Sequence, residues 1–324
     1  MKERLIKLQL IDGILQGNRG ILGKAITVIE STLPGDTDLS NDLVSEIMPE
    51  SGKSIRLGLT GVPGVGKSTF INRFGKIILE HGHKLAVLAI DPSSSNTRGS
   101  ILGDKTRMNE LLNYDNVFVR PTPTGETLGG VSRKTRETIL LCEAAGYDFV
   151  IVETVGVGQS EITVKNMVDF LTLLIPPVGG DEVQGIKKGI MEQADCIVIT
   201  KADGDMTTAA DKAMMDYSSA IRILSASNLT HKIPVMTCSS LKNIGLEEIY
   251  LFMLERINAR KREGLFTETR DKQYVQWMHH EIMNLIHDSI YKDPKKLKMI
   301  DTLEKRVLKK EISPQSAAKQ LLNS

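Results

Sequence analysis

The chain has 324 residues, of which 41% are hydrophobic and 25% charged, and its formal net charge is +1. This composition is typical of a soluble globular protein of one large or two ordinary domains, and so small a net charge argues against nucleic acid or a membrane surface as a partner. The start at Met1 shows no apolar signal core, and no apolar run reaches the roughly 18 residues of a membrane span, so we expect a cytoplasmic protein.

The two ends of the chain predict helices around a central domain. Residues 1–52 are expected to form a helical extension that ends in a polar linker at 49–52. Residues 261–324 contain no strand signal and predict helices around 275–290, 297–310 and 314–322, the last with Pro314 in its first turn and Ser313 as N-cap. The N-terminal pair of amphipathic helices is indicated by Leu5, Leu8, Leu10, Ile11 and Leu15, then Ile21, Ile26 and Ile29.

Residues 53–260 alternate apolar strands with helical stretches. Continuous apolar runs such as residues 86–90 indicate a sheet that is covered on both faces. Alternation with helices indicates an α/β fold with a mostly parallel, doubly wound sheet. The predicted strands are 55–60, 84–90, 117–120, 148–153, 169–175, 195–200 and 233–238.

Residues 61–68 match the phosphate-loop pattern GxxxxGK[ST], between a predicted strand and a predicted helix over 68–80. The loop's backbone N–H groups would face phosphates, Lys67 would reach the β- and γ-phosphate oxygens, and the Ser68 hydroxyl would bind Mg²⁺. This order of elements disfavours a chance glycine-rich turn. The predicted nucleotide contacts are Gly61, Gly64, Val65, Gly66, Lys67, Ser68 and Thr69.

Three acids follow at strand ends or polar turns. Asp91 ends one predicted strand and Asp104 lies in a later polar turn, and each would hold Mg²⁺ or cap a helix. Glu153 ends another strand and would orient the metal's water shell. Gly156 would offer its N–H to the γ-phosphate, and Gln159 would either position the attacking water or bond within its loop.

The loop at 176–189 is rich in glycine and proline and carries Lys187 and Lys188. The two lysines would stabilise charge on the transferred phosphate, from the same chain or a partner subunit, or would form a solvated basic pair. The predicted catalytic residues are Lys67, Glu153, Gln159 and Lys188.

Thr200-Lys201-Ala202-Asp203 ends a predicted strand and has the form of a guanine reader. Asp203 would accept two hydrogen bonds from the N1 and N2 groups of guanine, which adenine cannot supply, and the Lys201 stem would lie over the ring. Further support for the base would come from Ser239, Ser240 and Leu241.

Together these residues resemble the MeaB/ArgK/MMAA family of G3E-type GTPases, the chaperones of cobalamin-dependent acyl-CoA mutases. The matching stretches run over nearly the whole chain, and the most specific are GDKTRM and ETVGVGQSE. The resemblance implies a GTP-hydrolysing core. It also implies a mutase partner, usually methylmalonyl-CoA mutase, and a role in gating its adenosylcobalamin loading and limiting its inactivation. Because the sequence shows no strong general base, we expect slow GTP hydrolysis unless a partner completes the site. The resemblance implies homodimers formed through the C-terminal helices, and makes the 176–189 loop an additional switch.

Two positions depart from that family's pattern. Thr200 stands where the commoner guanine motif has Asn, and Arg98 stands where many members have Gly. The chain lacks the Asp-x-His-x-x-Gly cobalamin pattern, so cobalamin is expected to belong to the partner.

Two other functions compete with the mutase chaperone. A nickel- or cobalt-delivering GTPase needs a cluster of soft ligands such as cysteine and histidine. The three cysteines of this chain are far apart in the sequence and are predicted to be reduced core residues. Its two histidine pairs have no third ligand nearby. A transport-linked ATPase or kinase is disfavoured by Asp203. The residues concerned are Cys142, Cys196 and Cys238, and His81, His83, His279 and His280.

Overall fold

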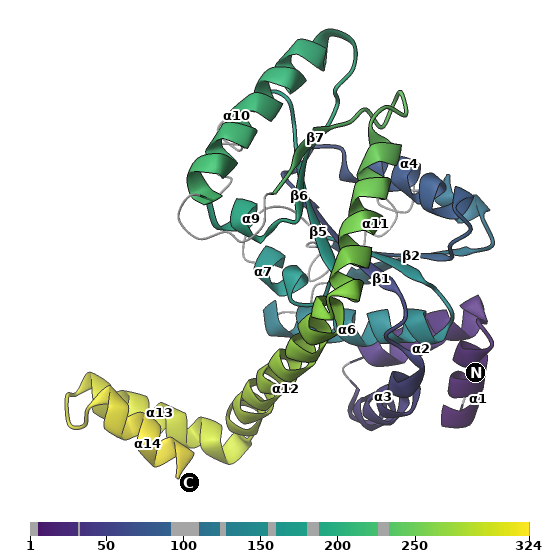
Figure 1. Cartoon of the computed structure of the whole chain (residues 1–324). Helices are drawn as coiled ribbons and strands as arrows, with labels where there is room; N and C mark the ends of the chain where they lie inside the picture. The colour runs from purple at the N-terminus through teal and green to yellow at the C-terminus, as the bar shows by residue number, and fades with distance from the viewer. Residues whose placement is uncertain are drawn as a thin grey trace. The chain divides into compact units, whose positions relative to one another are not determined.

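The computed structural model describes residues 6–31, 33–91, 110–123, 128–154, 160–179, 188–225 and 233–323. The chain divides into two compact units, Met1–Asp271 and Lys272–Ser324. The first unit contains an α/β sheet domain with helices before and around it, and the second is helical (Figure 1).

The sheet has seven strands within the described part of the chain, and every pair of neighbours is parallel. Its order is β3-β2-β4-β1-β5-β6-β7, so the first strand lies in the middle of the sheet. All seven predicted strands are therefore confirmed. Their bounds are β1 Ile55–Gly61, β2 Leu85–Asp91, β3 Val117–Pro123, β4 Phe149–Glu153, β5 Phe170–Ile175, β6 Cys196–Ile199 and β7 Val235–Thr237.

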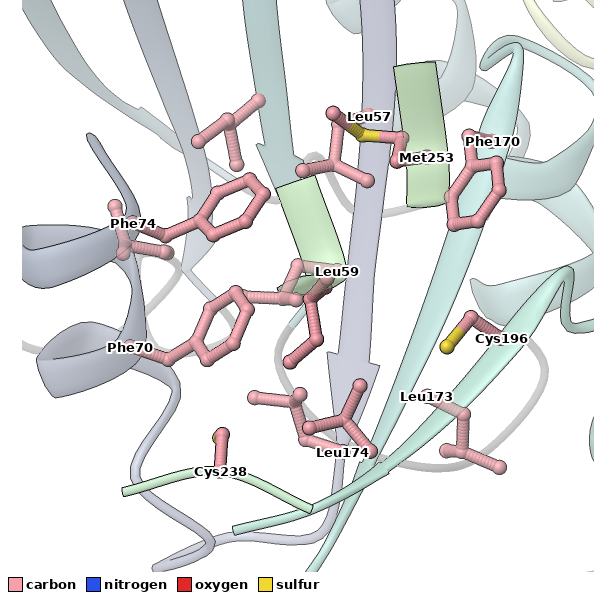
Figure 2. Packing of buried hydrophobic residues seen from close by; sticks show 14 of the residues in the cluster. Leu57, Leu59, Phe70, Phe74, Phe170, Leu173, Leu174, Cys196, Cys238 and Met253 are labelled. Carbon is pink, nitrogen blue, oxygen red and sulfur yellow. The ribbon is translucent and has the colours of Figure 1, made fainter. Parts of the chain in front are cut away.

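Strand β1 is buried on both faces, as predicted, although it contains the polar residues Arg56 and Thr60. Leu57 and Leu59 pack into the main core, and Figure 2 shows Phe70 and Phe74 of the following helix pointing toward them. On the opposite face Gly58 leaves no room for a side chain, because an added Cβ would come within 2.8 Å of Leu171.

Helices cover both faces of this sheet. On one face α4 packs against α11, where the Tyr250 ring stacks on His81 at 4.5 Å and meets Phe74 edge to face at 6.2 Å. Elsewhere α6, α7, α9 and α10 cover the sheet, and the N-terminal helices pack on α6. The helices of this unit are α1 Lys7–Leu15, α2 Arg19–Glu30, α3 Pro34–Ile47, α4 Lys67–Glu80, α6 Leu128–Ala144, α7 Ser160–Lys165, α9 Lys188–Gln193, α10 Thr207–Ser225 and α11 Leu246–Arg262, with 3₁₀ turns η1 Met48–Glu50, η2 Leu111–Asn113 and η3 Gly204–Met206.

The described part of the N-terminal extension contains three helices, so the expected helix pair is incomplete. Helix α3 has a buried side whose positions are Asp36, Ser40, Leu43 and Ile47. Since two of these four positions are polar, the apolar periodicity is too weak to predict the helix. The Ser31 hydroxyl donates to one Asp36 carboxylate oxygen at 2.7 Å.

A buried ion cluster of Arg56, Glu143, Asp169 and Arg270 lies at the amino-terminal ends of β1 and β5. Arg56 donates to both Glu143 oxygens at 2.8 and 2.7 Å, and Arg270 donates to both Asp169 oxygens at 2.8 and 2.6 Å. All four side chains are nearly inaccessible to solvent. Arg270 also donates to the Ser54 carbonyl at 2.7 Å, so the cluster ties the start of α12 (Leu265–Tyr291) to the segment before β1.

The second unit contains the rest of α12, α13 (Pro294–Leu308) and α14 (Pro314–Leu322). Ser313 caps α14 by accepting a hydrogen bond from the Ser316 N–H at 3.1 Å, with Pro314 in the first turn, as predicted. Helix α12 begins well before the expected residue 275. Helices α13 and α14 pack on each other around Leu303 and Ala317.

Candidate functional site

The phosphate loop joins the end of β1 to the start of α4, the arrangement that the sequence predicts. Val62 and Val65 are buried and fix the loop to the core. Gly66 has a φ of 101°, a conformation that residues with a side chain rarely adopt. At Gly61 an added Cβ would lie 2.6 Å from the Leu174 carbonyl oxygen, so neighbouring β5 also requires glycine there.

Lys67 is the first residue of α4 and folds back over the loop. Its Nζ donates to the Gly61 carbonyl at 2.9 Å and lies 3.4 Å from the Val62 carbonyl. The first turn of α4 carries no acidic residue, so the positive end of its dipole is available to an anion. Ser68 follows half-buried and Thr69 is exposed in this turn. The arrangement has the chemistry of a phosphate site.

The guanine-reader motif contacts this loop directly. The Thr200 hydroxyl donates to the Val65 carbonyl at 2.8 Å, and Lys201 Nζ donates to the Gly64 carbonyl at 2.9 Å. Lys201 has a φ of 56°, in the left-handed region. The structure thus brings together two predicted motifs that lie far apart in the sequence, and it gives Thr200 a role in holding the phosphate loop.

Asp203 follows and points to the turn after β7. The buried Ser239 hydroxyl donates to an Asp203 carboxylate oxygen, and the Ala202 N–H donates to the Cys238 carbonyl at 2.9 Å. Ser239 therefore orients the carboxylate. Ser240 lies half-buried in the same turn and the Leu241 side chain is 72% exposed.

Two of the three acids predicted to hold a metal end neighbouring strands at the same edge of the sheet. Glu153 ends β4 with 9% exposure, and its Cα is paired with Leu59 of β1 and Ala89 of β2. The backbone of Asp91 ends β2 at this edge, and its side chain lies outside the described part of the chain. The Ser68 hydroxyl and the Glu153 carboxylate are oxygen donors of the kind that Mg²⁺ prefers, so these residues fit that ion.

Other predicted site residues have no described side chain. Asp104, Gly156 and Gln159 lie outside the described residues, as does Lys187. The backbone of Lys188 begins α9, but its side chain is likewise outside the described part of the chain.

Sequence reasoning missed one contact at this edge. The Thr154 hydroxyl donates to the Thr60 hydroxyl at 2.9 Å, and both side chains are fully buried. The only signal available was a threonine at each strand end. Their meeting depends on the register between β1 and β4, which the sequence did not reveal.

The three cysteines are buried and free, as expected. Burial raises the pKa of the Cys238 thiol to about 12, so the thiol stays protonated at neutral pH. His81 and His83 contact different carboxylates, Glu247 and Asp148, each at 2.8 Å. Within the described ranges no three His, Cys, Asp or Glu side chains are grouped to hold a metal ion.

No helix within the described ranges combines the length and the apolar content that a membrane crossing requires.

The chain matches known proteins over most of its length. A family model described as "Methylmalonyl Co-A mutase-associated GTPase MeaB" matches residues 22–295. The chain is 44% identical to a protein of Mycobacterium tuberculosis named "Probable GTPase", over 97% of this chain and 93% of that protein. It is 49% identical to the GTPase ArgK of Escherichia coli, over 81% of this chain and 80% of that protein.

Two further matches are an animal protein and a solved structure. The chain is 42% identical, over its whole length and 80% of the relative, to the "Methylmalonic aciduria type A homolog, mitochondrial" of Mus musculus. A crystal structure of a LAO/AO transport system kinase superposes with a TM-score of 0.78 at 37% identity, covering 98% of each chain.

Proposed function

The chain belongs to the MeaB family of methylmalonyl Co-A mutase-associated GTPases, and from that premise we propose that it binds Mg²⁺-GTP where β1 turns into α4 and controls the loading of adenosylcobalamin into a cobalamin-dependent acyl-CoA mutase. The observation that carries the nucleotide part is the pair of hydrogen bonds from Thr200 and Lys201 to the phosphate loop. These bonds support a single site in which a base reader adjoins a phosphate cradle.

The proposed chemistry is attack of water on the γ-phosphate. Backbone N–H groups of the loop bind the phosphates, and Lys67 moves from the loop carbonyls to the phosphate oxygens as negative charge develops on them. Mg²⁺, when bound, supplies further charge stabilisation, and Ser68 and Glu153, with Asp91 and Asp104, would hold it. Gly156, Gln159 and Lys188 remain proposed contacts of the γ-phosphate and its water.

The nucleotide part is tested with Lys67→Ala. We expect wild-type protein to hydrolyse GTP slowly, and the variant to lose tight triphosphate binding in calorimetry, because the chief neutralising charge is gone. Lys76→Ala, on the exposed side of the same helix, serves as the control. Unchanged GTP affinity in the Lys67 variant would contradict the assignment of the site.

The mutase part is tested with purified methylmalonyl-CoA mutase. We expect the mutase to raise the rate of GTP hydrolysis. In a pull-down, we expect this protein to retain different amounts of mutase when it is loaded with non-hydrolysable GTP and when it is loaded with GDP. Equal retention in both nucleotide states would argue against nucleotide control. Cobalamin is proposed to bind the mutase, so the isolated chain should not bind it.

We also propose that the protein is a homodimer. In the second unit, Val275, Met278, Ile282 and Leu285 are between 44% and 64% exposed and follow the 3-4-3 spacing of a coiled-coil seam. An apolar stripe of this kind is stabilised by a second copy of the same helix.

A cytoplasmic location is part of the proposal, and cell fractionation would test it.

One related protein of solved structure is named a transport system kinase, which makes ATP the relevant competitor. Competition between ATP and GTP at equal concentration decides between the two nucleotides. We expect GTP to win, because Asp203 offers an acceptor pair that the adenine edge does not match.

A further inference from the structure

Two buried hydroxyls meet where β1 and β4 reach the nucleotide edge of the sheet. Thr154 donates to Thr60 at 2.9 Å, and the exposed fractions of the two residues are 1% and 0%. Thr60 directly precedes Gly61 of the phosphate loop, and Thr154 directly follows Glu153. The contact joins the segment that begins the phosphate loop to the segment that carries the proposed metal-orienting acid.

The backbone supports the same junction. The Thr154 N–H donates to the Leu59 carbonyl at 2.9 Å, which continues the β1–β4 ladder one residue beyond Glu153. Two hydrogen bonds from Thr154 thus fix the end of β4 against β1. The hydroxyl pair lies away from water, where a hydrogen bond is stronger than at the surface.

A short path of contacts links the two charged groups of the site through this pair. Thr60 directly precedes Gly61, the first residue of the phosphate loop, and that loop ends in Lys67. From Thr60 the path crosses the hydroxyl contact to Thr154, which is bonded to Glu153. A shift of β4 along β1 would change the separation between the Lys67 ammonium and the Glu153 carboxylate.

We propose that Thr60 and Thr154 are positioning residues for GTP hydrolysis, which hold Glu153 in register with the phosphate loop. This inference rests on the proposed function. The inference predicts that removing the hydroxyl pair lowers kcat but hardly changes nucleotide affinity, because other contacts hold the phosphate loop. Val62 and Val65 are buried, and Thr200 and Lys201 bond the loop independently of the pair.

The competing explanation is that the pair only stabilises the sheet. In that case its loss would lower the unfolding temperature and leave kcat unchanged in the folded protein. The two explanations are separated by measuring kcat and KM together with nucleotide affinity and thermal unfolding.

The decisive variants are Thr60→Val, which removes the hydroxyl and keeps the shape, and Thr60→Ser, which keeps the hydroxyl. Thr138→Val is the matched control, because Thr138 is also fully buried and its hydroxyl donates to the helical Lys134 carbonyl at 2.7 Å, within α6. Thr154→Val and the double variant with Thr60→Val complete a mutant cycle.

We expect Thr60→Val to lower the single-turnover GTP hydrolysis rate about five- to tenfold, as the loss of one buried hydrogen bond suggests, while the Kd for GDP changes less than about twofold. Thr60→Ser should restore most of the rate. The double variant should be no slower than the slower single variant, because both remove one shared contact. Thr138→Val should keep the wild-type rate.

A wild-type rate in folded Thr60→Val and Thr154→Val protein would overturn the inference, as would equal losses in kcat and in GDP affinity. If Thr60→Val does not fold, the hydrolysis rates and GDP affinities of Thr154→Val and Thr154→Ser are compared instead, with the same expected and contradicting results. Wild-type protein that neither binds nor hydrolyses GTP would instead refute the proposed function itself.

Discussion

At the scale of single residues, the proposed base site depends on Asp203, whose carboxylate accepts a hydrogen bond from Ser239. Asp203→Asn replaces one carboxylate acceptor with a donor, and two charge-assisted hydrogen bonds to guanine are lost or weakened. We expect the preference for GTP over ATP to fall by about ten- to a hundredfold. Competition binding measures this ratio.

The exposed neighbour Asp205 supplies the control for that experiment. Asp205→Asn makes the same chemical change outside the proposed site and should keep the wild-type preference. An undiminished preference in Asp203→Asn would move the base reader elsewhere.

Thr200 stands where the commoner motif has asparagine, and its hydroxyl donates to the Val65 carbonyl at 2.8 Å. Thr200→Val keeps the shape and leaves that buried carbonyl without this donor. We expect the affinities for GDP and for non-hydrolysable GTP to fall together by about fivefold, because the phosphate loop serves both nucleotides. Calorimetry on Thr200→Val and Thr200→Ser tests this, and a drop confined to GTP would speak against the role.

At the scale of elements, the buried ion cluster fixes β1, α6, β5 and the start of α12. Burial disfavours the charged form of Glu143, but the hydrogen bonds and charge of Arg56, with Arg270 and Ser54, outweigh burial and lower the pKa of Glu143. Its stabilising contribution is therefore complete above the ordinary glutamate pKa of about 4.3 and is lost as the pH falls through the lowered value.

Glu143→Gln tests this balance. At neutral pH it leaves two buried guanidinium groups with one fewer carboxylate, and we expect a loss of about 3–5 kcal/mol in the free energy of unfolding. Urea unfolding at a series of pH values should show the difference from wild type shrinking below about pH 4. The exposed Glu50→Gln variant is the control, and we expect its free energy of unfolding to match that of wild type at every pH. If the difference in unfolding free energy between Glu143→Gln and wild type grew as the pH fell, the lowered pKa of Glu143 would be contradicted.

The elements also show what the sequence could predict. Most strands were recognisable from their apolar runs, such as residues 86–90, and the phosphate loop followed from GxxxxGKS. Helix α3 was not recognisable, since Asp36 and Ser40 occupy buried positions. The Thr60–Thr154 contact depends on the register of two distant strands, which composition does not encode.

At the scale of the whole molecule, the proposed dimer interface is the apolar stripe of α12, formed by Val275, Met278, Ile282 and Leu285. Ile282→Glu places a charge in the middle of the seam, and we expect the dimer to dissociate into monomers in light scattering coupled to size-exclusion chromatography. Gln276→Glu adds the same charge beside the stripe and should stay dimeric. Monomeric wild-type protein at micromolar concentration would refute this assembly.

The position of β1 between β4 and β5 has a consequence for synthesis on the ribosome. The phosphate-loop sequence is translated early, but neither of its strand neighbours exists until residue 149 has been added, and the second is complete only at Ile175. Until then β1 is an apolar segment without its final partners, and such long-range parallel pairing is slow. The proposed base reader follows later still, at Thr200–Asp203 and Ser239. We therefore expect nucleotide-dependent protection of a stalled nascent chain to arise only once β7 and the turn after it have left the exit tunnel.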